Sequence, residues 1–330
     1  DLENKETSTF DNTGTLTATN TVTNSGTFTN KTAGTLTNIN TVTNYETFTN
    51  DGSFTAVDLE NKETSTFDNT GTLTATNTVT NAGTFTNKTA GTLTNINTVT
   101  NYETFTNDGS FTAVDLENKE TSTFDNTGTL TATNTVTNSG TFTNKTAGTL
   151  TNINTVTNYE TFTNDGSFTA VDLENKETST FDNTGTLTAT NTVTNSGTFT
   201  NETAGTLTAT NTVTNYETFT NDGTFTAVDL ENKETSTFDN TGTLTATNTV
   251  TNSGTFTNYT AGTLTNINTV TNYKTFTNDG SFTAVDLENK ETSTFDNTGT
   301  LTATNTVTNA GTFTNETAGT LTATNTVTNS

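Results

Sequence analysis

One 57-residue phrase recurs along this 330-residue chain and limits the possible folds more than any other feature. The text DLENKETSTFDNTGTLTATNTVTN begins at residue 1 and returns at residues 58, 115, 172, 229 and 286, where the last copy is partial. Self-similarity at a fixed period is typical of stacked repeats that share one core. We therefore expect residues 1–330 to form a single continuous solenoid, and we interpret the chain as a portion of a longer repetitive protein.

Within each copy the apolar residues stand about six positions apart, and nearly all lie between hydroxyl residues. They form three triplets: Leu16–Val22–Phe28, Leu36–Val42–Phe48 and Phe54–Leu59–Phe67. The repeat therefore divides into sub-repeats of 20, 18 and 19 residues that start at Thr15, Thr35 and Ser53. Apolar residues at helical spacing are absent, and Thr and Asn are poor helix formers, so a helical fold is excluded.

The tripeptide TLT places leucine on one side of a strand and both threonines on the other. Clusters such as NSG, NDG, NTG and TAG are typical of corners. We predict an all-β, three-faced parallel β-solenoid with 18–20 residues per coil and three coils per repeat. Its inward residues would form three ladders: Leu16, Leu36, Phe54 and Leu73; Val22, Val42, Leu59 and Val79; and Phe28, Phe48, Phe67 and Phe85.

The spacing of the residues also bears on the handedness of the coil. A left-handed hexapeptide helix needs a small inward residue four positions after the aliphatic one, but those slots hold Asn20, Gly26, Asn40 and Glu46. A buried glutamate would be costly. The unequal sub-repeats and this glutamate favour a right-handed solenoid over the left-handed alternative.

Asparagines recur two residues after the inward apolar residues. Asn24 and Asn44 follow the valines, and Asn30 and Asn50 follow the phenylalanines. We expect stacked asparagine ladders whose amides bond from coil to coil. The alternative is a set of solvent-facing turn asparagines.

Composition excludes several classes of function. The chain has no Cys, His, Trp, Met or Pro, all ten basic residues are Lys, and the net charge is −25. Disulfides, thiol or histidine catalysis and Cys/His zinc sites are excluded, and the charge opposes nucleic-acid binding. No apolar stretch could insert into a membrane as a helix. Because the same sparse groups return every 57 residues, we expect neither an enzyme nor a cofactor.

The coils of TLTATNTVTNSGTFTN text resemble the β-solenoid stalks of bacterial surface exoproteins, of the filamentous-haemagglutinin-like and autotransporter-passenger type. The resemblance covers the whole chain and implies an extracellular, cell-surface protein. We therefore expect a structural rod, stalk, filament or sheath that assembles with itself end to end or laterally. An adhesin that binds a receptor or glycan through a lateral face is the main alternative.

A third hypothesis rests on the outward threonines. The pairs Thr15/Thr17, Thr35/Thr37 and Ser53/Thr55 predict a hydroxyl pair in every coil of the first face, similar to ice-binding β-helices. Threonine is also simply a soluble, β-branched strand former.

Three sets of side chains are candidate sites. Asp58 and Glu60 point outward together and are a weak candidate for a cation; a solvated charge cluster that discourages aggregation is the alternative. The N-x-T sequons, in the widest corner, predict glycosylation at Asn30, Asn87, Asn144, Asn201, Asn258 and Asn315. A tyrosine recurs once per repeat and predicts lateral contacts or partial cover of the core: Tyr45, Tyr102, Tyr159, Tyr216 and Tyr273.

Overall fold

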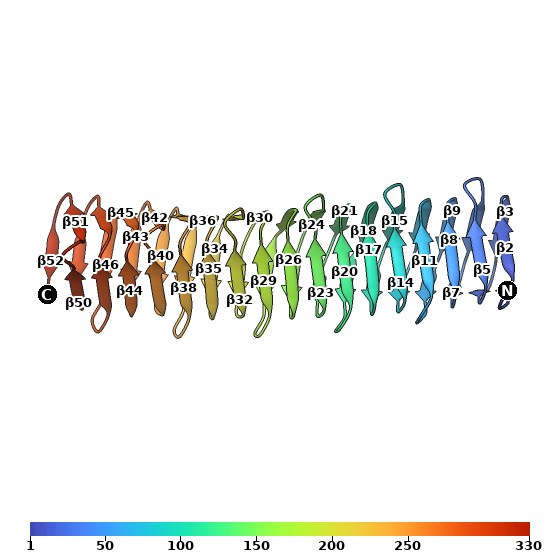
Figure 1. The fold of residues 1–330 in the computed structure, drawn as a ribbon, viewed down its shortest axis with the longest axis horizontal. Coiled ribbons are helices and arrows are strands. Elements are labelled where there is room, and N and C mark those ends of the chain that lie inside the picture. The colour runs from blue at the N-terminus through green and yellow to red at the C-terminus, as the bar shows by residue number, and fades with distance from the viewer. The chain divides into compact units, whose positions relative to one another are not determined.

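The computed structural model describes residues 1–330 and contains strands but no helix. It comprises two compact units, residues 1–168 and 169–330, and the division falls within β27 (Ser167–Ala170). In each unit every strand pairs in parallel with the strand one coil further along, so that three parallel sheets enclose the core (Figure 1). Each unit is therefore a three-faced parallel β-solenoid, as predicted.

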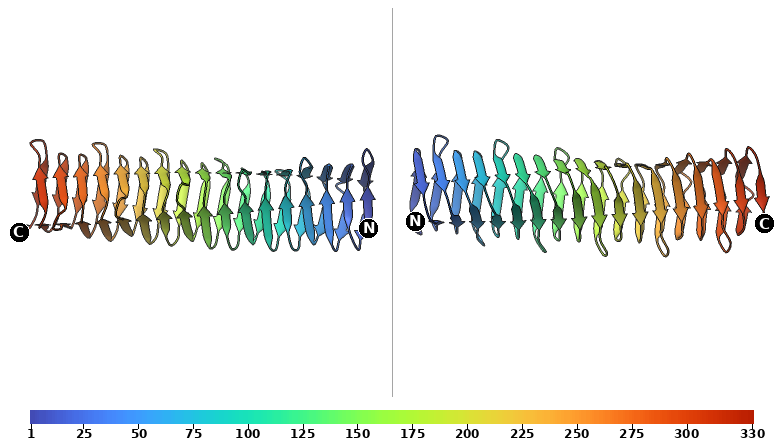
Figure 2. Two further views of the ribbon diagram at one scale, coloured as in Figure 1. Left: turned by 90° about the horizontal axis from the view of Figure 1, so that it is seen from below. Right: turned by 180° about the vertical axis from the view of Figure 1, so that it is seen from behind.

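We name the three sheets of a unit after their inward residues. The leucine face carries Leu or Phe inward from TLTA-type strands, the valine face carries Val or Leu, and the phenylalanine face carries Phe. Figure 2 shows the strands of these sheets side by side within each unit.

In the first unit the leucine face contains β3 (Thr15–Ala18), β6 (Thr35–Asn38), β9 (Ser53–Ala56), β12 (Thr72–Ala75), β15 (Thr92–Asn95), β18 (Ser110–Ala113), β21 (Thr129–Ala132) and β24 (Thr149–Asn152). Its valine face contains β1 (Leu2–Asn4), β4 (Val22–Asn24), β7 (Thr41–Asn44), β10 (Asp58–Asn61), β13 (Val79–Asn81), β16 (Thr98–Asn101), β19 (Asp115–Asn118), β22 (Val136–Asn138) and β25 (Thr155–Asn158). Its phenylalanine face contains β2 (Thr9–Asn12), β5 (Thr27–Asn30), β8 (Thr47–Asn50), β11 (Thr66–Asn69), β14 (Thr84–Asn87), β17 (Thr104–Asn107), β20 (Thr123–Asn126), β23 (Thr141–Asn144) and β26 (Thr161–Asn164).

In the second unit the leucine face contains β30 (Thr186–Ala189), β33 (Thr206–Ala209), β36 (Thr224–Ala227), β39 (Thr243–Ala246), β42 (Thr263–Asn266), β45 (Ser281–Ala284), β48 (Thr300–Ala303) and β51 (Thr320–Ala323). Its valine face contains β28 (Asp172–Asn175), β31 (Val193–Asn195), β34 (Thr212–Asn215), β37 (Asp229–Asn232), β40 (Thr249–Asn252), β43 (Thr269–Asn272), β46 (Asp286–Asn289), β49 (Val307–Asn309) and β52 (Val327–Asn329). Its phenylalanine face contains β29 (Thr180–Asn183), β32 (Thr198–Asn201), β35 (Thr218–Asn221), β38 (Thr237–Asn240), β41 (Thr255–Asn258), β44 (Thr275–Asn278), β47 (Thr294–Asn297) and β50 (Thr312–Asn315).

The strand register confirms the predicted ladders. Leu16 pairs with Leu36, which pairs with Phe54, so the sub-repeats of 20 and 18 residues each make one coil. Val22 pairs with Val42 on the valine face in the same way. The corners absorb the unequal lengths, because the strands themselves stay in register.

The phenylalanines form a continuous stack inside each unit. In the first unit neighbouring rings from Phe10 to Phe162 lie 4.6–5.0 Å apart between centroids and within 12° of parallel. Phe54, from the leucine face, adds a side contact at 5.3 Å from Phe48. All but the first of these rings are fully buried, so this aromatic column is the largest apolar component of the core.

The inward asparagines form two internal ladders, and the solvent-facing alternative is wrong. The Nδ2 of Asn24 donates to the Oδ1 of Asn44 at 2.8 Å, and Asn44 donates in the same way to Asn61. A second ladder joins Asn30 to Asn50 with the same distance. These amides are fully buried, and no buried side-chain polar atom in the structure lacks a partner. The ladders therefore stabilise the coil-to-coil stacking without an unpaired polar group.

Close backbone approach, not positive φ, explains the glycines of the corner that precedes the leucine face. No glycine has a positive φ. A Cβ at Gly109 would overlap the carbonyl oxygens of Lys88 and Gly91 in the coil before it. These corners therefore stack too tightly for any side chain.

We expect Gly109→Ala to lower the free energy of unfolding by about 1–3 kcal/mol, because the new methyl group forces two coils apart. Urea unfolding of the two proteins measures the loss. Gly14→Ala is the control, since no heavy atom lies within 4 Å of its Cβ position. Equal stability of Gly109→Ala and the parent chain would contradict the close packing of this corner.

Three of the four slots that a left-handed hexapeptide helix would use are exposed here. Asn20, Asn40 and Glu46 are exposed at corners, Gly26 is buried at a corner, and the second inward residue of each strand is Asn or Ala. The right-handed winding and the continuity of one solenoid over residues 1–330 stay predictions.

Candidate functional site

Asp58 is a structural clamp at the corner between the leucine and valine faces. Its Oδ1 accepts hydrogen bonds from the Asn77 amide at 2.8 Å, the Thr78 backbone N–H at 3.1 Å and the Thr78 hydroxyl at 2.6 Å. The same three bonds return at Asp115, Asp229 and Asp286. The recurrence shows that this carboxylate joins one coil to the next in every copy.

Glu60, the second half of the cation candidate, forms an ion pair with Lys62 at 2.6 Å. At the start of the chain the Lys5 ammonium beside Glu3 lowers the pKa of that carboxyl through a hydrogen bond and its charge. No group of three or more acidic side chains in the structure could hold a metal ion. A cation would therefore have to displace both Lys62 and the donors to Asp58, and the weak cation site stays a prediction.

The sequon asparagines lie inside the solenoid, which corrects their predicted place in the corner loop. Asn87 is fully buried, and its Nδ2 donates to Asn107 at 2.8 Å. Of the three sequon residues, only Lys88 and Thr89 lie in the corner between β14 and β15. Asn30, Asn144, Asn201 and Asn258 are buried in the same way; Asn315 is exposed. A glycan on a buried amide would break the ladder, so any modification at these five positions would have to precede folding.

The recurrent tyrosines stand at the corner between the valine and phenylalanine faces. Tyr45, Tyr102, Tyr159, Tyr216 and Tyr273 are each 46–50% exposed. Three coils separate successive tyrosines within a unit, which is about 14 Å at the spacing of β-strands. The rings are therefore accessible for lateral contacts, and that role stays a prediction.

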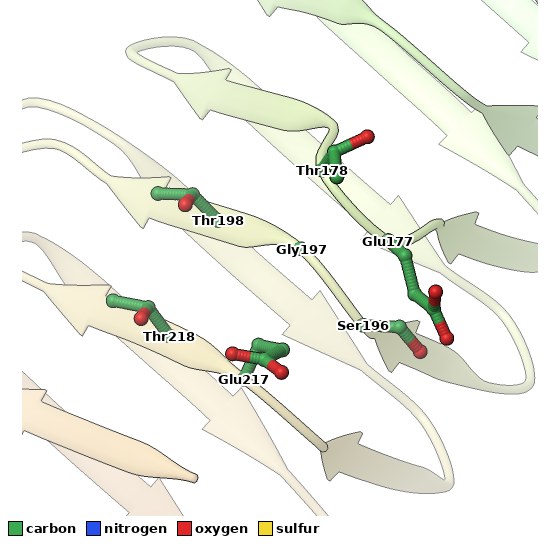
Figure 3. A pocket seen from close by; sticks show the side chains of 7 residues that line it. All are labelled: Glu177, Thr178, Ser196, Gly197, Thr198, Glu217 and Thr218. Atoms are coloured by element: carbon green, nitrogen blue, oxygen red, sulfur yellow. The ribbon is translucent and has the colours of Figure 1, made fainter.

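The same corner carries a shallow groove in five of the repeats. In the second unit one groove of about 340 Å³ is lined by Glu177 and Thr178 on one coil, Ser196 to Thr198 on the next, and Glu217 and Thr218 on the third (Figure 3). Gly197 forms its floor, because a Cβ there would overlap carbonyl oxygens of Lys176 and Ser179. Thr178 has a φ of +65°, which is unusual for a β-branched residue.

Chemically the grooves offer hydroxyl groups and isolated carboxylates. Glu177 and Glu217 lie two coils apart, about 10 Å along the stack. Equivalent grooves surround Gly26, Gly83 and Gly140 in the first unit, so the arrangement is a repeated surface and not a unique constellation. In the fifth repeat Lys274 replaces the second glutamate.

The corner between the phenylalanine and leucine faces differs between the units. In the first unit Lys88 pairs with Asp68 at 3.1 Å and Lys145 pairs with Asp125 at 3.5 Å. In the second unit the equivalent lysine positions hold Glu202, Tyr259 and Glu316. Burial raises the pKa of both Asp182 and Asp239, with the nearby Asp222 charge adding to the effect at Asp239. The aspartates of the second unit are therefore half-buried without a lysine partner.

We expect Glu202→Lys to restore this ion pair and to raise the free energy of unfolding at neutral pH by up to about 1 kcal/mol. A raised folded-state pKa means that the stability associated with Asp182 is complete at acid pH and is lost as pH rises through that pKa. The gain should therefore shrink in acid, where Asp182 is protonated. Urea unfolding at both pH values measures it.

Lys145→Glu is the matched control, because it makes the opposite change at the equivalent position of the first unit. It should lower the stability at neutral pH by a similar amount. A pH-independent effect of Glu202→Lys would contradict the role of the Asp182 carboxylate.

The predicted hydroxyl pairs are present on the leucine face. Thr15 pairs with Thr35, Thr17 with Thr37, and Thr37 with Thr55 in the next coil. Asp58 and Glu60 interrupt the corresponding columns on the valine face, and Asp68 interrupts one on the phenylalanine face. The leucine face is thus the one whose outward columns contain only Thr and Ser. Ice binding by this face stays a prediction.

The family model of the BigA fourth domain matches residues 1–137, 55–191 and 169–329, which together span nearly the entire chain. The chain belongs to the BigA fourth domain family. This is a family of bacterial surface proteins, so the predicted likeness to bacterial surface repeats is confirmed at that level. No curated protein and no solved structure matches the chain.

Membership of the BigA fourth domain family agrees with the repeated surface features of this chain. The structure has no helix that could cross a membrane. Its repeated features are clamps, ladders and tight corners, all of which join one coil to the next.

Proposed function

We propose that this chain is a structural spacer on the outside of a bacterial cell, where stacked β-coils hold other parts of a surface protein away from the envelope. The observation that carries the proposal is the repetition of one internally bonded coil unit without a unique site. Asn24, Asn44 and Asn61 bond in series, and the same series returns in later copies. Such a design adds length by adding copies, because each coil contacts only its neighbours.

Membership of the BigA fourth domain family supports an extracellular location. The resemblance of the repeats to exoprotein stalks supports the same location. The surface composition fits as well: outward threonines and a net charge of −25 keep extended β-sheets soluble. A carboxylate on the valine or phenylalanine face in every repeat discourages unwanted sheet contacts.

Antibody labelling of intact bacteria tests the location. An antibody raised against the chain should label intact cells as strongly as permeabilised cells, while an antibody against a cytoplasmic protein labels only the permeabilised ones. Signal confined to permeabilised cells would reject the proposal.

Deletion of one whole repeat tests the spacer role. Removal of residues 58–114 keeps every strand in register, so the folded protein should shorten by about 14 Å, the rise of three coils. Electron microscopy measures this length. Removal of residues 58–104 is the control, because it joins strands out of register and should prevent folding of the adjoining coils.

An adhesin is the second candidate, favoured by the exposed tyrosine row. Tyr45, Tyr102 and Tyr159 present aromatic rings at a regular interval beside glutamates, an arrangement suited to stacking on a sugar or peptide. Replacing the three tyrosines by Ala should abolish binding to host cells or glycans while the coil stability is unchanged. Unchanged binding would reject this candidate.

A further inference from the structure

The leucine face is the one surface of each unit on which the strands carry no charge. Its strands have only the sequences TLTA, TLTN, SFTA and TFTA, so every outward residue is Thr or Ser. The chain nevertheless carries 35 acidic residues. The charges are therefore confined to the other two faces and the corners.

The other two faces oppose contact between copies. On the valine face Asp58 and Glu60 occupy both outward positions of β10, and equivalent pairs return once per repeat. On the phenylalanine face Asp68 occupies one of the two outward positions of β11, and its equivalents return once per repeat. Two copies that met through these faces would place like charges opposite one another, which is destabilising.

The leucine face is large enough for a specific contact. Each of its strands covers about 60 Å², so eight strands in one unit present about 500 Å². Two such surfaces would bury about 1,000 Å² in total, which is the lower limit for a specific protein interface. Both units present eight complete strands on this face.

Threonine makes the face complementary to itself. Each side chain offers one hydroxyl that can both donate and accept a hydrogen bond, and one methyl group that can pack. The identical spacing of strands on two copies lets the rows interdigitate, as in the dry interfaces between stacked sheets. Lys31 and Asp51 lie at the corner beside this face, where water and salt screen their charges.

We propose that two copies of this chain associate side by side through their leucine faces. The net charge of −25 on each copy opposes their approach, and salt reduces that repulsion. The association should therefore strengthen with salt. The proposal does not depend on the spacer role, because pairing of the purified chain and surface labelling of cells are separate measurements.

Sedimentation velocity of the full chain, from micromolar to near-millimolar concentration at 0.15 and 1 M salt, tests the proposal. The wild type should form dimers in a concentration-dependent manner, more strongly at high salt. The triple substitution Thr15→Asp, Thr72→Asp and Thr129→Asp places one charge in each repeat of the first unit on exposed positions of the leucine face. A matching triple at Thr186, Thr243 and Thr300 treats the second unit. The combined variant should remain monomeric, with at least a tenfold weaker association.

The control variant carries the same number of Thr→Asp changes at exposed first positions of phenylalanine-face strands: Thr47, Thr104, Thr161, Thr198, Thr218 and Thr255. It should dimerise like the wild type, and unchanged thermal melting of both variants excludes misfolding as the cause. A wild type that is monomeric throughout, or equal weakening by both variants, would overturn the proposal. Binding of the monomer to ice or to an insoluble polysaccharide through the same threonines would also overturn the proposal, because the leucine face would then bind that surface and not a second copy of the chain.

Discussion

Replacing Phe85 by Asp should abolish the local order of the first unit around that coil. The Phe85 ring is fully buried and stacks between Phe67 at 4.9 Å and Phe105 at 4.7 Å. The change removes a buried aromatic ring, which alone costs about 3–5 kcal/mol. It also places a carboxylate with no partner in an apolar column, which adds to that cost. We expect the surrounding coils to open, because each coil is held only by its neighbours.

Hydrogen exchange of peptides that cover residues 67–124 measures this opening, together with the rate of proteolysis. Thr84→Asp is the matched control: it introduces the same charge one residue earlier, on an exposed outward position. Its exchange should resemble that of the parent chain, and Thr84→Ser should be nearly silent. Equal protection of the Phe85→Asp and Thr84→Asp proteins would mean that Phe85 is not part of the core.

Converting one ladder asparagine to aspartate should have the second largest effect. The Nδ2 of Asn101 donates to the Oδ1 of Asn118 at 2.8 Å and to the Thr123 carbonyl at 3.0 Å, while its Oδ1 accepts from Asn81 at 2.8 Å. Asn101→Asp keeps the shape of the side chain but replaces both donors by an oxygen that faces acceptors. We expect a loss of at least about 3 kcal/mol, since a buried charge loses its partners.

Urea unfolding at neutral and acid pH measures the loss. Protonation of the new carboxyl in acid should recover part of the stability, because a neutral carboxyl can donate one hydrogen bond again. Asn97→Asp, at an exposed corner, is the control and should cost less than about 0.5 kcal/mol. A small loss for Asn101→Asp would show that the ladder contributes little to coil stacking.

The two ladders and the phenylalanine column together explain how a chain with only 27% hydrophobic residues folds. Three apolar side chains per coil cannot balance the conformational entropy of about 19 ordered residues. The asparagine amides add inward hydrogen bonds from coil to coil at the edges of the apolar column. In the structure these bonds link Asn30 to Asn50 and Asn24 to Asn44 in the same coils in which Phe28 stacks on Phe48.

The local pattern of residues was enough to predict the fold class, the length of each coil and the inward ladders. Leu16, Val22 and Phe28 stand about six positions apart, each between hydroxyl residues. They can share one apolar core only if they point inward from three successive faces of one coil. The repeat of Asn24 and Asn30 in the same phase indicated the amide ladders for the same reason. These inferences held because they depend on local periodicity, which a strand preserves.

The stacking of the coils was needed to show which polar residues remain available for function. Asn87 carries a sequon, but its amide is buried in the ladder, and Asp58 is occupied by Asn77 and Thr78. The partners of both residues lie 18–20 positions away in the sequence, on the neighbouring coils. Contacts at that separation cannot be read from the residues on either side of Asn87 or Asp58. Periodicity shows which way a side chain points, whereas the stacking of coils determines what it meets there.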